Sequence, residues 1–268
     1  MKAPKTILKK RVRIMDNRFF DIHSHALWGM DDGSQDLETT VELCDMAAET
    51  GTGTLFLTPH LMYWENAERL YDKRERKFEG LSEILDEEGI PLRIEKGFEI
   101  LCDDDIFDIK YFKPYTLCDS RYLLIEFDFF KPTYEDVNAW CDYIKSFGVV
   151  PVIAHPERYE FFHNDYAAID KLSQKGNLFQ INMGSAAGMF GEDVQDFAVR
   201  MINGGFADFF GSDAHDLRFR NTDMAFCLEN FPFGLNEEVI ENALFVNPQS
   251  IIKDEQIKVN RLGYFAEI

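Results

Sequence analysis

The sequence contains a short motif, Asp21-Ile22-His23-Ser24-His25, in which the polar side chains capable of chemistry are spaced two apart. Side chains two apart on a β-strand point to the same face, so the two imidazoles would project together. Two imidazoles at the end of a strand can bind one metal ion. Two solvated histidines on a surface strand would show the same pattern, so the motif alone is weak evidence.

Other residues of ligand type occur at the ends of apolar, strand-like segments or in the loops that follow them. These residues are Asp32, His60, Glu99, Glu126, His155, Asp213 and His215. In a barrel of parallel strands the carboxyl ends converge on one face, where such folds place their sites. The pattern includes five of the six histidines. We expect the sixth, His163, to lie in a loop, at the surface or at the rim of the substrate site.

The ligand set combines imidazoles and carboxylates and contains no thiolate, which suits manganese, iron or zinc in a hydrolytic role. Nine candidate ligands are more than one ion needs, and three ions that share carboxylates would use them all. A cluster of this kind generates hydroxide near neutral pH and neutralises the oxygens of a transferring phosphoryl group.

Arginines accompany two of the predicted ligands. Arg158 lies three residues after His155, and Arg218 and Arg220 lie just beyond His215. Guanidinium groups match phosphate oxygens in a fork geometry, so metals and arginines on one rim predict phosphate-ester hydrolysis rather than amide hydrolysis. We expect Arg158 and Arg220 to bind the phosphate; a surface salt bridge would account for Arg218 equally well.

The elements that must position these residues alternate along the chain. The predicted strands are Phe19–His25, Thr54–Thr58, Arg93–Ile100, Tyr122–Phe127, Val149–Ala154, Leu178–Asn182 and Phe206–Gly211. The predicted helices are Leu37–Glu49, Ala67–Glu88, Thr133–Phe147, Tyr166–Lys175, Asp193–Asn203 and Glu237–Leu244. Alternation predicts an α/β domain with parallel strands, either a closed barrel or a doubly wound sheet. No Gly-x-Gly-x-x-Gly follows the first strand, which argues against a dinucleotide fold.

The overall charge of −20 argues against binding to nucleic acid and against docking of the protein body on anionic membranes. The segment 1–18 differs, because it carries seven Lys or Arg residues and a single acidic residue, Asp16. We predict a flexible basic tail over 1–18, or a weak tether to an acidic partner or membrane, followed by one domain over 19–268. The tail lacks the apolar region of a signal peptide.

No segment has the run of about 18 apolar residues that a membrane helix needs. The five cysteines are scattered and form no Cys-x-x-Cys pair, which predicts reduced thiols in a cytoplasmic protein. The helical patterns favour no particular oligomeric state.

The segments that carry the ligands and arginines are FFDIHSHALWGMDDGS, LFLTPH, KGFEI, LLIEF, PVIAHPERY, FQINMGS and FFGSDAHDLRFR. In these segments the chain resembles the PHP (polymerase and histidinol phosphatase) superfamily. Within it, the chain is most similar to the bacterial capsular and exopolysaccharide tyrosine-protein phosphatases of the CpsB/CapC/YwqE type. The resemblance runs from Phe19 to about Arg220, and its joint pattern of motifs is highly specific.

The resemblance implies a distorted (β/α)7 barrel of the TIM type with three metal ions, usually manganese. It divides the ligands into three sets, namely His23, His25, Glu99 and Asp213; Glu99, Glu126 and His155; and Asp32, His60 and His215. It further implies that Arg158 and Arg220 hold the phosphate of a phosphotyrosine. The implied substrate is a phosphorylated protein, the cognate tyrosine autokinase that drives polysaccharide export.

The remaining parts of the expected site are open. Aromatic residues near the ligands are candidates for a rim around the phenyl ring, although ordinary packing is the favoured explanation for each: Tyr63, Trp64, Tyr159, Phe161 and Phe162. Tyr63 and Trp64 follow Thr-Pro-His-Leu-Met. The resemblance leads us to expect a second histidine after Thr-Pro-His in several relatives, and this chain has none there. Asp216 and His215 are the candidates for the acid that protonates the leaving group.

The cysteines test the chemistry independently, because a thiol-based tyrosine phosphatase needs an arginine six residues after its cysteine. None of the five cysteines has one. Three other functions compete with the phosphotyrosine hypothesis. These are a phosphatase of histidinol phosphate or a nucleotide, a non-catalytic metal-binding regulator of the kinase, and a metal-dependent amidohydrolase. Amidohydrolases often carry a lysine at the end of a mid-chain strand, and no apolar strand here ends in one.

Overall fold

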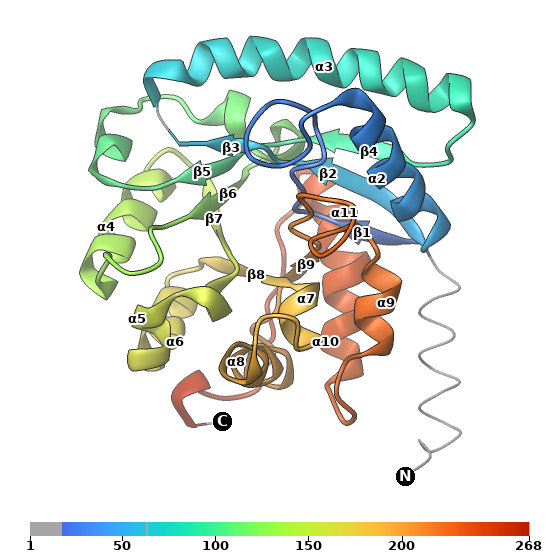
Figure 1. Ribbon diagram of the computed structural model, residues 1–268. Helices are drawn as coiled ribbons and strands as arrows, with labels where there is room; N and C mark the ends of the chain where they lie inside the picture. Colours follow the sequence, from blue (N-terminus) through green and yellow to red (C-terminus); the bar gives the residue numbers. More distant parts are fainter. Residues whose placement is uncertain (1–17, 63, 268) are drawn as a thin grey trace.

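The computed structural model describes residues 18–62 and 64–267 (Figure 1). Most of the predicted basic tail and Tyr63 therefore lie outside the described residues. Arg18, the last residue of the predicted tail, is bound to the body of the protein. Its Nη1 donates hydrogen bonds to the carbonyl oxygens of Thr52 at 3.1 Å and Pro91 at 2.9 Å.

The strands form two parallel sheets. Their bounds are β1 (Phe19–Asp21), β2 (Thr52–Leu57), β3 (His60–Leu61), β4 (Arg93–Lys96), β5 (Glu99–Leu101), β6 (Tyr122–Glu126), β7 (Val150–Ala154), β8 (Leu178–Asn182) and β9 (Phe209–Gly211). One sheet has the order β1-β2-β4 and the other the order β3-β5-β6-β7-β8-β9. All the described pairings are parallel, so the predicted α/β class with parallel strands is confirmed.

The two sheets are parts of one curled arrangement. The chain passes from β2 to β3 and from β4 to β5 after only two residues, so each sheet continues into the other. At the far edge, β9 returns to the segment after β1, where Ile22 N donates to Phe210 O at 3.3 Å and Ser24 forms a bridge with Ala214. This curl brings the carboxyl ends of first and last strands together.

The helices surround the strands (Figure 1). Their bounds are α2 (Leu37–Glu49), α3 (Ala67–Glu88), α4 (Tyr134–Lys145), α5 (Glu160–Asn164), α6 (Ala167–Gln174), α7 (Met183–Ala186), α8 (Glu192–Asn203), α9 (Met224–Glu229), α10 (Glu237–Glu241) and α11 (Asn247–Ile252). Short 3-10 turns are η1 (Trp64–Asn66), η2 (Asp104–Asp108), η3 (Lys113–Tyr115), η4 (Leu117–Asp119), η5 (Pro156–Arg158) and η7 (Phe265–Glu267); η6 (Asn242–Val246) is a π-helix. None of the described helices combines the length and apolar character needed to cross a bilayer.

Local signals in the sequence explain where the long helices begin and end. Asp36 caps α2 by accepting from Thr39 N, and Gly89 ends α3 in the left-handed conformation with φ of 71°. Thr133 and Asp136 form a reciprocal capping box at the start of α4. The predicted helices over 37–49 and 67–88 match the observed ones in full.

The predicted strand over 93–100 is interrupted at Gly97. Gly97 N donates to Leu57 O at 3.1 Å, and a Cβ at this position would lie 2.6 Å from the side chain of Leu117. A larger residue here would require the Leu117 side chain to move. The interruption sets the direction of the following strand, which begins with the predicted ligand Glu99.

Arg74 of α3 forms hydrogen bonds with the backbone at this interruption. Its side chain is buried, and Nη1 donates to Gly97 O at 3.1 Å while Nη2 donates to Pro114 O at 3.3 Å. The guanidinium also forms an ion pair with Glu75 and lies 4.5 Å from the ring centroid of Phe98. Burial lowers the pKa of Arg74, and Glu75 counteracts that effect.

We predict that Arg74→Met destabilises the fold by about 2–4 kcal/mol, because it leaves buried carbonyl oxygens without donors. The free energy of unfolding in urea measures this loss. Arg76→Met on the same helix is the matched control, because Arg76 is exposed. Equal stability of the two variants would show that the buried hydrogen bonds of Arg74 contribute nothing.

Candidate metal centre

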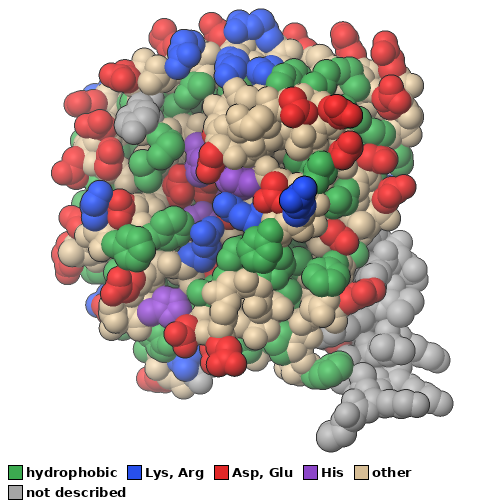
Figure 2. Space-filling model, in the orientation of Figure 1, with side chains coloured by type: hydrophobic (Ala, Val, Ile, Leu, Met, Phe, Trp, Pro, Cys, Tyr) green, Lys and Arg blue, Asp and Glu red, His purple; other side chains and the backbone are tan. Residues whose placement is uncertain are grey.

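The predicted ligands come together at the carboxyl ends of the parallel strands. His23 and His25 follow β1, His60 begins β3 and Glu99 begins β5. Glu126 ends β6, His155 follows β7, and Asp213 and His215 follow β9. Asp32 lies in the loop before α2. In the space-filling view, histidine, acidic and basic side chains gather at the centre of one face (Figure 2).

Glu99 lies at the centre of this group and is fully buried. Its Oε2 lies 3.1 Å from His23 Nε2, 3.2 Å from His25 Nε2 and 3.1 Å from His60 Nδ1. Its Oε1 lies 2.9 Å from His155 Nε2. Burial opposes the charged form of Glu99, but the surrounding imidazoles outweigh burial and hold its pKa well below the usual range.

The donor set fits a divalent cation. Oε2 of Glu99 is buried and has no hydrogen-bond partner among the described residues, although three imidazole nitrogens surround it. Buried polar atoms are rarely left unpartnered in proteins, and each such case calls for an explanation. A bound ion shared by these nitrogen and oxygen atoms would satisfy the carboxylate.

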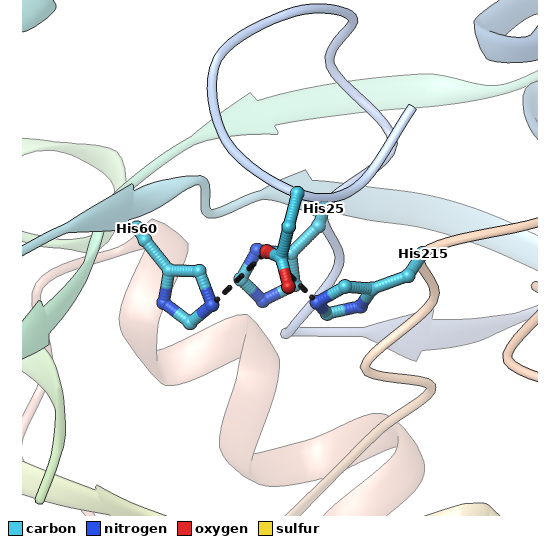
Figure 3. A group of neighbouring side chains, drawn as sticks. His25, His60 and His215 are labelled. Atoms are coloured by element: carbon cyan, nitrogen blue, oxygen red, sulfur yellow. Dashed lines mark ion pairs between the residues drawn. The ribbon is translucent and has the colours of Figure 1, made fainter. Parts of the chain in front are cut away.

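A second part of the group is open to solvent. Asp32 Oδ1 lies 3.6 Å from His60 Nε2 and 3.5 Å from His215 Nε2 (Figure 3). The side chain of Asp32 is 71% exposed, while that of His60 is 16% exposed. The ring of His25 lies behind them, with its centroid 4.3 Å from that of His60 and 4.1 Å from that of His215. This end of the group is therefore accessible from outside.

All nine predicted ligands fall into four overlapping groups whose ligand atoms lie within 4.8 Å of one another. The groups are His25, Asp32, His60 and His215; His23, Glu99 and His155; His23, His25 and Asp213; and His60, Glu99 and Glu126. The division differs from the one that the resemblance implies. Glu126 groups with His60 rather than with His155, and His25 joins Asp32 as well as His23.

Two predicted phosphate-binding arginines contact the same carboxylate, that of Asp213. Arg158 Nη1 lies 3.1 Å from Oδ2, and Arg220 Nη2 lies 2.6 Å from Oδ1. Asn182 donates to Oδ2 at 2.7 Å. Arg218, by contrast, is exposed and lines a neighbouring cavity. The structure therefore brings Arg158 and Arg220 to the ligand group and leaves Arg218 beside it.

The backbone is strained at two of the ligands. His155 has φ of 33° and Asp213 has φ of 54°, in the left-handed region that favours glycine. Such conformations cost about 1–3 kcal/mol each and cluster at functional sites. His155 directly follows the last residue of β7, and Asp213 lies two residues beyond the end of β9. At both positions the backbone turns the ligand side chain toward the other ligands.

Asp31 is a functional residue that sequence reasoning missed. Its Oδ2 lies 2.7 Å from His25 Nδ1 and accepts from His60 N at 2.8 Å, while Oδ1 accepts from Gly33 N at 3.0 Å. Burial raises the pKa of Asp31, but the His25 ring outweighs burial and the pKa falls to about 2. The adjacent acids of Asp31-Asp32-Gly33 were the available signal.

Gln180 of β8 has a similar role toward His23, because its Oε1 lies 2.8 Å from His23 Nδ1. A carboxylate or amide on the second ring nitrogen fixes the orientation of a ligating imidazole. Gln180 lies in a strand that was predicted but contributed no predicted ligand. Inward-facing polar residues of that strand could have been found by the same two-residue spacing.

The pKa values of the ligand histidines are shifted in different directions. Burial and the His60 ring lower the pKa of His25, but nearby carboxylates outweigh them and raise it to about 9. Burial also lowers the pKa of His60, yet Glu99 and Glu126 raise it to about 12. For His215, burial and the His25 ring lower the pKa to about 4. His215 is therefore neutral at pH 7, the state in which imidazole binds metals.

The described aromatic residues that were candidates for a rim pack against other side chains of the protein. Trp64 is half-buried and packs edge-on against Phe112 and Tyr115, with centroid distances of 6.1 and 5.4 Å. Tyr159 and Phe162 are fully buried. Tyr63 lies outside the described residues, and the half-buried Phe161 packs its ring against those of Tyr159 and Phe162. Packing explains the described members of this set.

His163 does not lie in a loop, so that expectation was wrong. It belongs to α5 and is half-buried, with Nε2 2.8 Å from the carbonyl oxygen of Glu157. Its ring packs against Phe197 at a centroid distance of 4.7 Å. His163 belongs to none of the four groups of ligand-type residues described above.

Comparisons with known proteins identify the family and several relatives of this chain. Residues 19–253 match the family model described as capsular polysaccharide synthesis, CpsB/CapC. Tyrosine-protein phosphatase YwqE of Bacillus subtilis is 33% identical over 255 residues, which cover 91% of this chain and 98% of YwqE. Tyrosine-protein phosphatase CpsB of Streptococcus pneumoniae is 29% identical over 245 residues, with coverage of 88% and 99%.

A solved structure also matches this chain with a TM-score of 0.75 and 31% identity, over 90% of this chain and 97% of the other. It was solved in work on YwqE from Bacillus subtilis and CpsB from Streptococcus pneumoniae, which are described there as metal-dependent tyrosine phosphatases.

We predict that Asp31→Asn weakens binding of a divalent metal by about 10–100-fold, because His25 loses the carboxylate that orients its ring. Competition with a chelating dye measures the affinity. Asp45→Asn is the matched control, since Asp45 is exposed on α2. An Asp31→Asn protein that binds metal as tightly as the control would exclude this role.

Proposed function

The chain belongs to the CpsB/CapC family of capsular polysaccharide synthesis proteins, and from this premise we propose that it is a metal-dependent protein-tyrosine phosphatase. The observation that carries the proposal is the position of Arg158 and Arg220 on Asp213, beside eight further candidate metal ligands. Ligands and arginines on one rim match the charges of a phosphate ester bound to cations. The names of the relatives supply the phosphotyrosine.

The fold that we propose is a single domain formed by a distorted (β/α)7 barrel. This count takes β2 with β3 and β4 with β5 as single interrupted strands. The short connections through Thr58-Pro59 and Gly97-Phe98 support it. The contact between β9 and the segment after β1 supports closure of the barrel.

We propose a cluster of three divalent ions, with manganese as the first choice and iron or zinc as alternatives. The residues that would hold them are His23, His25, Asp32, His60, Glu99, Glu126, His155, Asp213 and His215. When bound, such ions lower the pKa of water and neutralise phosphoryl oxygens.

The chain itself contributes binding and orientation of the phosphate. Arg158 and Arg220 contact the two oxygens of Asp213, so a phosphate bound beside this carboxylate would lie within reach of both guanidinium groups. Fork-shaped donors fix the orientation of the phosphate as well as its position. Asn182 also donates to Asp213 Oδ2, so Asp213 would keep a partner if an arginine turned toward a substrate.

Neither candidate acid is suited to protonate the leaving group. His215 has a pKa lowered to about 4 by burial and the His25 ring, so it is not in the imidazolium form that acts as an acid at pH 7. Burial raises the pKa of Asp216, but the backbone N–H groups of Phe219, Arg218 and Arg220 outweigh it. Since a phenol has a pKa near 10, phenolate leaves without a strong acid.

The substrate that we propose is phosphotyrosine on a protein, and the partner is a tyrosine autokinase of capsular or exopolysaccharide synthesis. The exposure of Asp32 supports a substrate carried on a protein surface, because one end of the ligand group is open. We place the reaction in the cytoplasm. The five cysteines are all free thiols, which agrees with a reducing compartment.

We predict that the purified protein with manganese releases phosphate from a phosphotyrosine peptide, and that a chelator abolishes the release. A panel containing histidinol phosphate and a nucleotide monophosphate tests whether a small ester is preferred. Phosphate release is measured with a colorimetric assay. Full activity in excess chelator would rule out metal dependence.

We also predict that His155→Ala lowers activity by at least about 100-fold, since Glu99 loses the imidazole 2.9 Å from its Oε1. His163→Gln is the matched control, because His163 lies outside the ligand groups and should retain activity. The same two variants are compared by metal content. Activity that survives in His155→Ala would sink the assignment of His155.

A further inference from the structure

Arg158 lies between two phenylalanine rings that the expected rim did not include. Its Cζ is 4.9 Å from the ring centroid of Phe129 and 5.2 Å from that of Phe190. One end of the guanidinium forms the ion pair with Asp213, at 3.1 Å. The two rings therefore hold Arg158 toward the ligand group by cation–π contacts.

Phe190 continues outward to a second aromatic residue. Its ring meets that of Phe219 edge-on, with a centroid distance of 5.9 Å and an interplanar angle of 83°. Phe219 precedes Arg220 in the chain and is 53% exposed. The aromatic pair Phe190–Phe219 thus connects the two arginines on the outer side of the ligand group.

The cavity beside this pair has an apolar side and a polar side. Met189, Phe190, Phe219 and Phe226 form the apolar side, and the polar side includes Arg218, Arg220, Asn221 and Asp223. In the space-filling view, hydrophobic side chains border the basic side chains next to the histidines (Figure 2). A phosphate held by the two arginines would therefore have apolar surface directly beside it.

The loop that carries Phe190 is built to reach this place. Gly188 and Gly191 have φ of 86° and 100°, so they turn the chain sharply on both sides of Phe190. A Cβ on Gly184 would lie 3.0 Å from Met189 Sδ and 3.1 Å from the ring of Phe190. The close packing against Gly184 supports the position of the ring.

We propose that Phe190 and Phe219 form the subsite for the aromatic ring of the phosphorylated tyrosine. This inference rests on the proposed function and adds the residues that select an aryl over an alkyl phosphate ester. Edge-on aromatic contacts favour a ring over an aliphatic chain of similar area. The partly exposed ring of Phe219 would be covered by the substrate.

Binding of two phosphonates to the manganese-loaded protein tests the subsite. Benzylphosphonate carries a ring at the distance of a phenyl phosphate and cannot be hydrolysed, while methylphosphonate carries none. Titration calorimetry gives both dissociation constants for the wild type, Phe190→Leu, Phe219→Leu and the double variant. Phe147→Leu is the control, since Phe147 is a partly exposed phenylalanine next to the amino end of β7, at the opposite end of the strands.

We expect each leucine variant to weaken benzylphosphonate binding roughly three- to tenfold and methylphosphonate binding less than twofold. The control should change neither. Equal weakening of both phosphonates would show that the rings act only by holding Arg158, and would overturn the proposal. Unchanged binding of both would overturn it as well. Metal content and urea midpoints identify any variant that has lost its fold.

Hydrolysis by the wild type separates this proposal from the proposed function. If the manganese-loaded wild type fails to hydrolyse a phosphotyrosine peptide, the proposed function is wrong whatever the phosphonates show. If it hydrolyses the peptide while the leucine variants keep the wild-type preference for benzylphosphonate, only the aromatic subsite is wrong.

Discussion

The arrangement depends on one buried carboxylate, that of Glu99. A charged oxygen without access to water is unfavourable unless cations or donors surround it. Imidazoles from β3 and from the segments after β1 and β7 converge on its two oxygens. They can do so only if strands that are distant in the sequence end at the same place. The curl of the parallel sheet brings those strand ends together.

The backbone at the strand ends shows what this convergence costs. His155 and Asp213 adopt left-handed conformations, and Gly97 interrupts a strand two residues before Glu99. The fold tolerates these features because surrounding contacts hold them, including the hydrogen bond from Arg74 to Gly97 O and the bond from Asp213 N to His23 O at 2.8 Å. Two of the five described non-glycine residues with positive φ are predicted ligands, His155 and Asp213.

Sequence reasoning found the features that repeat with a period and missed those that depend on the fold. The long helices α2 and α3 were predicted because their apolar spacing and end signals are local. The short helices α5 and α7 have too few turns to show that spacing. Ligands at strand ends were predictable from position. Asp31 and Gln180 left a local signal that was not used, whereas the role of Phe190 depends on Arg158, which is distant in the sequence.

Charge links the proposed metal ions to the proposed substrate in this site. The ligand group contains four carboxylates, those of Asp32, Glu99, Glu126 and Asp213, and the two arginines beside it balance only half of their charge. In the metal-free group the carboxylates outweigh burial and raise the pKa of His25 to about 9 and that of His60 to about 12, so at pH 7 these two imidazoliums balance the remaining carboxylate charge. Divalent cations would displace these protons and leave the site with an excess of positive charge, within a chain whose overall charge is −20. Substrate binding and metal binding are then coupled by electrostatics, before any chemistry takes place.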